Sequence, residues 1–214
     1  PYARDTINVI AAILKSLPTG YLQKTLADGI RFAPNGYLQN ADFQGSNLSS
    51  ALLNKKEATD NHKNSNFEGT DFFQANLSQA TLRNSILIGA VFCEATLYET
   101  RFNNSQLQKS NFSGSSLHGT NFSDANLTGA DLEFADLTGA DLRYADLTGG
   151  VDLGHADLTG ADLTGADLSY ADLTAAILES ADFTGAIVTD ADFIDTYWYQ
   201  TIWTDGVAYD ENQA

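Results

Sequence analysis

The sequence predicts an all-β solenoid, in which the chain winds into stacked coils around one hydrophobic core. The first observation is a period of five, because an apolar residue recurs at every fifth position through most of the 214 residues. The second is a small residue two places before the apolar one, as in ADLTGADLTGADLSY. Helices place apolar residues at i, i+3, i+4 and i+7, and amphipathic strands place them at every second position. A period of five therefore requires a backbone that turns a corner once per repeat.

The period can be counted on the apolar residue at the centre of each repeat. Seventeen centres follow without a miss from Phe67 to Leu147, and eleven more run from Leu153 to Trp203. A one-residue insertion within 149–151 separates the two runs. A shorter run in a different phase precedes them at Leu38, Phe43, Leu48 and Leu53. At the 43% apolar content of this chain, chance does not produce such a series.

The repeats ADLTG, NFSDA, ADLRY and ADFTG resemble the pentapeptide-repeat family. The pattern of that family is a small residue, Asp or Asn, Leu or Phe, a polar residue, and often Gly. The resemblance covers about residues 37–203. It implies a right-handed quadrilateral β-helix of about eight coils, in which four pentapeptides make one square coil. Members are numerous in cyanobacteria, and most have no known activity.

If four repeats close a coil, residues twenty apart stack at the ~4.8 Å spacing of paired strands, and backbone groups bond between coils. Centres and small residues then point inward, so Phe72, Phe92 and Phe112 should stack on one face. Tight corners favour positive φ, which glycine adopts without steric penalty. The glycines predicted at corners are Gly129, Gly139, Gly149, Gly160 and Gly165.

Residues 1–36 are predicted to form an N-terminal α-helical cap. Asp5 or Thr6 can act as the N-cap of a helix that Pro18 and Gly20 end. The first coil of a β-helix exposes strand edges and an open core, which such a cap covers. A helix that binds a partner protein is the alternative interpretation.

The repeats of residues 37–203 should form one continuous domain. Within it, residues 54–65 contain almost nothing apolar, and Leu53 and Phe67 are fourteen residues apart rather than fifteen. We interpret this stretch as a loop outside the solenoid, and a degenerate face of a coil is the alternative.

The predicted loop contains Lys55, Lys56 and Lys63, the one local basic cluster of the sequence. Loops in regular repeats often carry binding functions, and the resemblance adds that gyrase-protecting members have functional loops. The three lysines are therefore candidate interaction residues, and a solvated insertion without a role is the alternative.

Aromatic residues are predicted to close the C-terminal end. Trp198 and Trp203 occupy the last centres, and residues 204–214 form a polar tail that turns at Asp205 and Gly206. Large side chains there plug the core where no further coil stacks. A dimer interface is the alternative, which the resemblance to gyrase-protecting members implies. We favour the plug and a monomer, because the tail adds little apolar surface.

The net charge of −17 is distributed unevenly. Residues 1–110 hold ten Lys or Arg and nine Asp or Glu, whereas residues 111–214 hold Arg143 and nineteen Asp or Glu. An acidic half of this kind repels nucleic acid and anionic membranes. The apolar stretch at residues 7–17 is far shorter than the ~20 residues that span a bilayer. We therefore expect a protein partner, with neither nucleic-acid binding nor membrane insertion.

The compartment stays open, because no targeting segment is visible after Pro1. A soluble protein of the cytoplasm fits the sequence, as does the periplasm or the thylakoid lumen if a presequence was removed. Cys93 is the one cysteine, so an intramolecular disulfide is impossible. We expect its thiol to point outward without a role.

Stacking at twenty residues predicts ladders of aspartates. Asp141, Asp162 and Asp182 form one ladder, and a second contains Asp131, Asp152, Asp172 and Asp192. Such carboxylates can bind Ca²⁺, but a calcium site also requires carbonyl groups and a closed loop. We expect local hydrogen bonds to backbone and water instead, with no metal and no cofactor. The first ladder is a candidate interaction surface.

No catalytic constellation is visible, so we expect no enzyme. His62, His118 and His155 lie far apart without a matching nucleophile, and Ser and Thr are expected at positions that face solvent. The predicted function is a structural or protein-interaction scaffold of unidentified partner. The alternative is a DNA mimic that binds a type II topoisomerase, as the resemblance to quinolone-resistance members implies.

Overall fold

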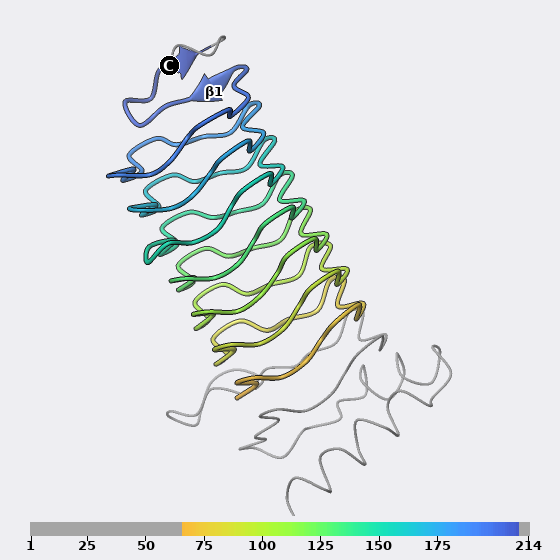
Figure 1. Ribbon diagram of the computed structural model, residues 1–214. Helices are drawn as coiled ribbons and strands as arrows, with labels where there is room; N and C mark the ends of the chain where they lie inside the picture. The colour runs from red at the N-terminus through yellow and green to blue at the C-terminus, as the bar shows by residue number, and fades with distance from the viewer. Residues whose placement is uncertain (1–65, 210–214) are drawn as a thin grey trace, which may run out of the picture.

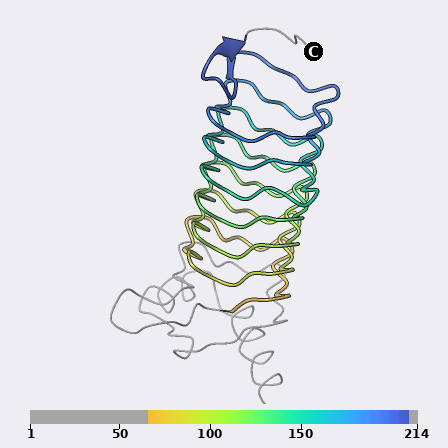
Figure 2. The same cartoon turned by 90° about the vertical axis from the view of Figure 1, so that its left-hand side faces the viewer.

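The structure, a computed structural model, describes residues 66–209 as a rod of stacked coils (Figure 1). Parallel bridges join residues twenty apart, beginning with Asn66 to Ile86 and Asp71 to Val91. Bridges recur at every fifth residue, so each coil has four sides, and the view from the side shows the coils stacked evenly (Figure 2). The predicted solenoid with four repeats per coil is confirmed for these residues.

Several predictions fall on residues outside the described range. These are the helical cap at residues 1–36, the first run of centres at 38–53, the loop at 54–65 and the last five residues of the tail.

We name the four sides by their columns of bridged residues. Face A contains Asp71, Val91, Asn111, Asp131, Asp152, Asp172 and Asp192. Face B contains Asn76, Thr96, Ser116, Asp136, Asp157, Ile177 and Tyr197. Face C contains Thr81, Arg101, Asn121, Asp141, Asp162, Asp182 and Ile202. Face D contains Asn66, Ile86, Gln106, Asn126, Asp146, Asp167 and Ile187. The residue two places after each of these projects from the same face, and the next residue forms the corner.

Backbone hydrogen bonds between coils hold the stack together. The N–H of Phe72 donates to the carbonyl of Val91 at 2.7 Å, and the N–H of Gln74 donates to the carbonyl of Cys93 at 3.0 Å. In the opposite direction, the N–H of Val91 donates to the carbonyl of Thr70 at 2.9 Å. Repetition of this pattern satisfies the backbone groups along the rod, as the sequence predicted.

Each corner is a tight turn with a left-handed residue. The N–H of Thr70 donates to the carbonyl of Phe67 at 3.0 Å, and Gly69 between them has a φ of 62°, as in a type II turn. The five predicted corner glycines all have positive φ. Seventeen non-glycine residues between 66 and 209 also have positive φ, and Tyr144 at 58° is one of them.

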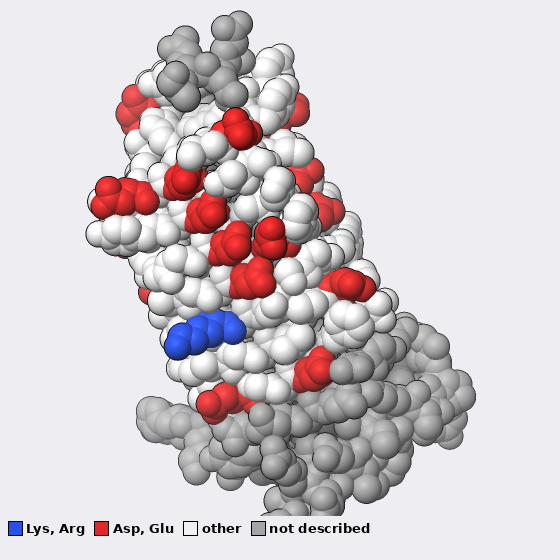
Figure 3. Space-filling model, viewed as in Figure 1, with Lys and Arg blue, Asp and Glu red and all other residues white. Residues whose placement is uncertain are grey.

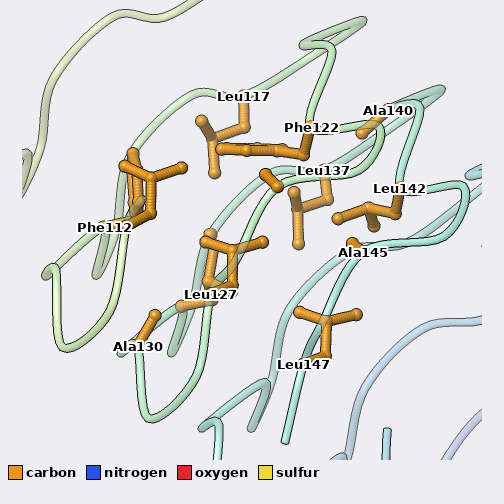
Figure 4. Close-up of a cluster of buried hydrophobic side chains, with 14 of the residues drawn as sticks. Phe112, Leu117, Phe122, Leu127, Ala130, Leu137, Ala140, Leu142, Ala145 and Leu147 are labelled. Carbon is orange, nitrogen blue, oxygen red and sulfur yellow. The ribbon is translucent and has the colours of Figure 1, made fainter. Parts of the chain in front are cut away.

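The apolar centres fill the axis of the rod (Figure 4). Every centre from Phe67 to Phe183 is buried, with at most 1% of its surface exposed. The rings of Phe72 and Phe92 stack with centroids 4.9 Å apart, and those of Phe92 and Phe112 stack at 4.7 Å. These distances match the ~4.8 Å expected between coils, which confirms the inward assignment.

The expectation that Ser and Thr face solvent was wrong at the position before the bridged residue. The early coils place hydroxyl side chains where later coils place alanine, and there they are buried. The hydroxyl of Thr100 donates to the carbonyl of Leu77 at 2.8 Å, and that of Thr120 donates to Leu97 at 2.8 Å. A carbonyl of a neighbouring turn accepts the proton, so the core tolerates the polar group. The buried hydroxyl residues are Thr70, Ser85, Thr100, Ser105, Ser110, Ser115, Thr120, Thr196 and Thr201.

The insertion at 149–151 is absorbed at one corner. Gly149 and Gly150 have φ values of 72° and 73°, and beyond them Asp131 pairs with Asp152 rather than with residue 151. The stack therefore continues with its faces aligned.

A short antiparallel hairpin follows the last coil. Strand β1 (Thr201–Ile202) pairs with β2 (Ala208–Tyr209). The predicted turn at Asp205 and Gly206 joins them, and the N–H of Gly206 donates to the carbonyl of Trp203 at 2.9 Å.

Candidate interaction surface

The aspartates before the centres are held by their own backbone. Oδ1 of Asp162 accepts the N–H of Thr164 at 3.0 Å, and Oδ1 of Asp182 accepts the N–H of Thr184 at 2.8 Å. Asn111 accepts the N–H of Ser113 in the same way at 2.8 Å. The prediction that these side chains bond locally to backbone is confirmed. Asp or Asn suits the position because a short side-chain oxygen reaches a backbone N–H two residues on.

The structure stacks the predicted ladder Asp141, Asp162 and Asp182 on face C, and it adds Arg143. The Arg143 guanidinium contacts Asp141 through Nε at 2.8 Å and Nη2 at 2.7 Å. Its Nε also lies 3.6 Å from Oδ2 of Asp162 in the next coil. The hydrogen bonds between Arg143 and Asp141 lower the pKa of the Asp141 carboxyl and raise the pKa of the Arg143 guanidinium. Our sequence reasoning missed Arg143, although two-residue spacing on a strand places it on the face of Asp141.

Charge is divided unequally among the faces. In the view of Figure 3, Asp and Glu are spread along the rod and Lys or Arg is scarce. Arg83, Arg101 and Arg143 lie on face C, and Lys109 lies at the corner after face D. Within residues 66–209, faces A and B and the corners that follow them contain no Lys or Arg. Their acidic residues are Asp71, Glu94, Glu99, Asp131, Glu133, Asp136, Asp152, Asp157, Asp172, Glu179, Asp192 and Asp195.

The two described histidines pack against aromatic rings. His118 stacks on Tyr98 with centroids 5.3 Å apart, and His155 stacks on Phe134 at 4.7 Å. No group of three or more His, Cys, Asp or Glu within residues 66–209 is placed to hold a metal ion. Cys93 is half-buried, and its Sγ accepts a long hydrogen bond of 3.5 Å from the hydroxyl of Ser113.

The structure brings the two predicted tryptophans together at the C-terminal end. The rings of Trp198 and Trp203 lie with centroids 4.5 Å apart. Trp203 also packs on Phe183 at 5.3 Å, and Trp198 packs on Phe193 at 5.5 Å. Both are partly buried against the core. Lys55, Lys56 and Lys63 lie outside the described residues.

Our sequence reasoning also missed how apolar residues are distributed over the outer surface of the rod. On the outward strand positions, apolar residues occur near both ends of the described rod, and none occurs between residues 101 and 174. These outward residues are the second and fourth positions of each repeat. Their pattern is hard to see in the sequence because the apolar centre recurs in every repeat. The residues of the first group are Phe73, Ile86, Ile88, Val91, Cys93 and Tyr98, and those of the second are Ile177, Ile187, Ile194, Tyr197, Tyr199 and Ile202.

A chain of four-repeat coils around one apolar axis is a β-solenoid repeat protein. The family model described as Pentapeptide repeats (8 copies) matches residues 61–87, 75–114, 115–151 and 149–185. The chain therefore belongs to the pentapeptide-repeat family. The proteins of this family are generally non-enzymatic scaffolds.

The part of the chain that the structure describes contains no helix that is long and apolar enough to cross a membrane.

Solved structures of pentapeptide-repeat proteins are similar to this chain. A protein from the Arabidopsis thaliana thylakoid lumen is 39% identical over 46% of this chain and 68% of its own, with a TM-score of 0.45. HetL from the cyanobacterium Nostoc, involved in heterocyst differentiation regulation, is 24% identical over 90% of this chain and 100% of its own, with a TM-score of 0.32.

A third similar structure is trypsin-treated QnrB1, a plasmid-mediated fluoroquinolone resistance protein. It is 19% identical over 64% of this chain and 69% of its own, with a TM-score of 0.46. No curated protein matches the chain.

Proposed function

We propose that this protein is a non-enzymatic scaffold that binds another protein through its acidic faces. The observation that supports this most is the charge of faces A and B and the corners that follow them, where twelve acidic side chains stand without a Lys or Arg between residues 66 and 209. The inter-coil hydrogen bonds hold these carboxylates on a rigid backbone. A rigid array of one charge attracts a partner of opposite charge and fixes its register.

The proposal extends to parts of the chain that the described residues do not cover. A helical cap over residues 1–36 covers the first coil, and the loop at 54–65 offers Lys55, Lys56 and Lys63 as further contacts. The coils wind right-handed, and Trp198 and Trp203 plug the core of a monomer.

Affinity capture with the full chain tests the scaffold. The variant Asp131→Asn, Asp152→Asn, Asp172→Asn removes three charges from face A, and Asn keeps the local hydrogen bond that Asn111 makes. Asp162→Asn, Asp167→Asn, Asp182→Asn is the matched control on faces C and D, with the same change of net charge. We expect the wild type to capture a partner protein from extracts of the source cell. The face A variant should capture less of this partner, and the control variant should capture as much as the wild type. Equal capture by both variants and the wild type would argue against binding through the acidic faces.

A DNA mimic is the second candidate, and the density of charge favours it. Residues 111–203 carry sixteen Asp or Glu and Arg143, a net of −15. Over about 4.6 coils at ~4.8 Å per coil, this is about one charge per 1.5 Å, close to the ~1.7 Å of duplex DNA. The acidic part is only about 22 Å long by the same spacing, so two molecules joined through Trp198 and Trp203 are needed to imitate a useful length of DNA.

An assay of gyrase supercoiling separates the two candidates. We expect a monomer that leaves supercoiling unchanged at micromolar concentration. A stable C-terminal dimer that inhibits supercoiling, with inhibition that weakens as salt rises, would favour the mimic.

A further inference from the structure

Within residues 66–209, the last coil of the solenoid is open on three of its four faces. Val188, Phe193 and Trp198 are the centres on faces D, A and B, and none of their backbone N–H groups has a partner within residues 66–209. One coil earlier, the N–H of Leu173 donates to Asp192 at 2.8 Å, and the N–H of Leu178 donates to Tyr197 at 2.8 Å. On face C, the hairpin partner β2 covers the edge beside β1.

Apolar side chains surround this open edge. Ile187 is 50% exposed, Ile194 60%, Tyr197 52% and Tyr199 42%. We call these four residues the C-terminal rim. An unpaired strand edge beside exposed apolar residues is a template for a further strand.

The charge at this end indicates what kind of strand it accepts. Asp190, Asp192 and Asp195 lie among the rim residues in the sequence, which contains no Lys or Arg after Arg143. Two copies meeting end to end would bring both sets of carboxylates into one interface, and like charges in an interface are unfavourable. A cationic partner is favoured for the same reason.

We propose that the C-terminal rim binds an extended cationic segment of a partner protein, in which Lys or Arg alternates with apolar residues. The segment adds as a strand to the open edge. Alternate side chains of a strand point to opposite sides. The apolar ones therefore cover Phe193 and Trp198 on the core side, while the basic ones lie on the outer side, where their charges face Asp192 and Asp195 and their aliphatic stems pack on rim residues such as Ile194. This inference rests on the proposed scaffold function and states where and by what chemistry a partner binds.

The protein carries its own reporter for this site, because Trp198 and Trp203 are its two tryptophans and both lie at the open end. The probe is a synthetic octapeptide of alternating Lys and Val, titrated into the full-length protein while tryptophan emission is recorded. Octapeptides of alternating Glu and Val, and of alternating Lys and Ser, are the controls for charge and for apolar contact. We expect a saturable change in emission with the first peptide and none with the other two.

Two variants locate the binding. Ile194→Ser removes a rim side chain, and we expect it to raise the Kd of the Lys-Val peptide about tenfold. Phe134→Asn is the matched control, because Phe134 is 59% exposed in the middle of the rod and Asn tolerates its φ of 59°. This control should leave the Kd unchanged. Both variants should keep the circular dichroism of the wild type, and Phe134→Asn should melt slightly lower because it loses the stack on His155.

Other outcomes would overturn the inference. Equal binding of the Lys-Val and Lys-Ser peptides, or equal losses in Ile194→Ser and Phe134→Asn, would show unspecific electrostatic attachment. A dimer in sedimentation equilibrium that Ile194→Lys dissociates would show that a second copy covers the rim. Neither result would contradict the proposed scaffold function, because the capture experiment on face A tests that function separately.

Discussion

The ring of Tyr144 lies over Gly165, at the same corner of the next coil. A Cβ atom built on Gly165 would come within 2.7 Å of Cδ1 and Cε1 of Tyr144. Gly165 also has a φ of 67°. Glycine is therefore favoured at position 165 for two reasons: it adopts a positive φ without strain, and it has no Cβ atom to clash with the Tyr144 ring. Most other corners require only the positive φ.

Gly165→Ala should lower the Tm more than Gly160→Ala does. Gly160 has a φ of 66°, and no atom lies within 4 Å of the place that an alanine methyl group would take. Alanine at 160 therefore meets only the cost of the left-handed conformation, about 1–2 kcal/mol. Alanine at 165 must also displace the Tyr144 ring. In a Tyr144→Asn background the two glycine variants should melt alike, and a difference that persists there would contradict the proposed contact.

Leu163→Lys should cost several kcal/mol, because Leu163 is fully buried on the axis and an unpaired charge there loses its water. Asp162→Asn is the neighbouring control. Its side chain is only partly buried, and Asn keeps the Oδ1 that accepts the N–H of Thr164. Thermal unfolding measures both variants, and equal losses of Tm would mean that the inward assignment is wrong.

Arg143→Met should lower the Tm at pH 7 and lose this effect in acid. Hydrogen bonding to Arg143 lowers the pKa of folded Asp141 below its unfolded value. The pair therefore stabilises the fold above the ordinary Asp pKa of ~3.9, and this contribution is lost as the pH falls through the folded pKa. Because both side chains are partly exposed, the effect should be small and sensitive to salt.

Lys109→Met is the control for that experiment, since no ion pair within residues 66–209 involves Lys109. Its Tm difference from the wild type should not follow the same pH dependence. A deficit in Arg143→Met that is as large at pH 2.5 as at pH 7 would rule out the ionised pair as its cause.

Moderate salt should raise the Tm, because faces A and B carry acidic side chains without neighbouring Lys or Arg. Like charges ~5 Å apart in water repel by under about 1 kcal/mol each, and salt screens this repulsion. The variant Asp131→Asn, Asp152→Asn, Asp172→Asn should melt higher at low salt and respond less to added NaCl. A wild type and variant with the same salt dependence would show that repulsion along face A does not limit stability.

Ser85→Ala should raise stability by about 1 kcal/mol, because the buried Ser85 hydroxyl has no hydrogen-bond partner within residues 66–209. Ser105→Ala is the control one coil later at the same position. The Ser105 hydroxyl donates to the carbonyl of Leu82 at 3.0 Å, so its removal should be neutral or destabilising. Melting curves of the two variants decide this, and a loss of stability in Ser85→Ala would reveal a partner for its hydroxyl.

Periodicity predicted the fold because the same local rule repeats along the chain. Leu163 and Asp162 were assigned inward and outward from their place in the repeat, and the ladder through Asp182 followed from twenty-residue stacking. Trp198 and Trp203 were expected at the end of the core because they continue the period. These predictions depend on the five-residue spacing together with the four repeats per coil that the resemblance to the pentapeptide-repeat family implies.

The sequence by itself determined the inward residues, because a five-residue period places the same position of every repeat on the core side. The four repeats per coil that the family resemblance implies then set the columns of the faces. The tertiary structure decided what depends on contacts between coils. It placed Arg143 between Asp141 and Asp162 and gave the buried hydroxyl of Thr100 its carbonyl acceptor. It also put β2 over the edge of face C, whereas no residue of the described range pairs with the edges of faces D, A and B. Such contacts depend on distances and directions between residues of different repeats, which a periodic pattern does not contain.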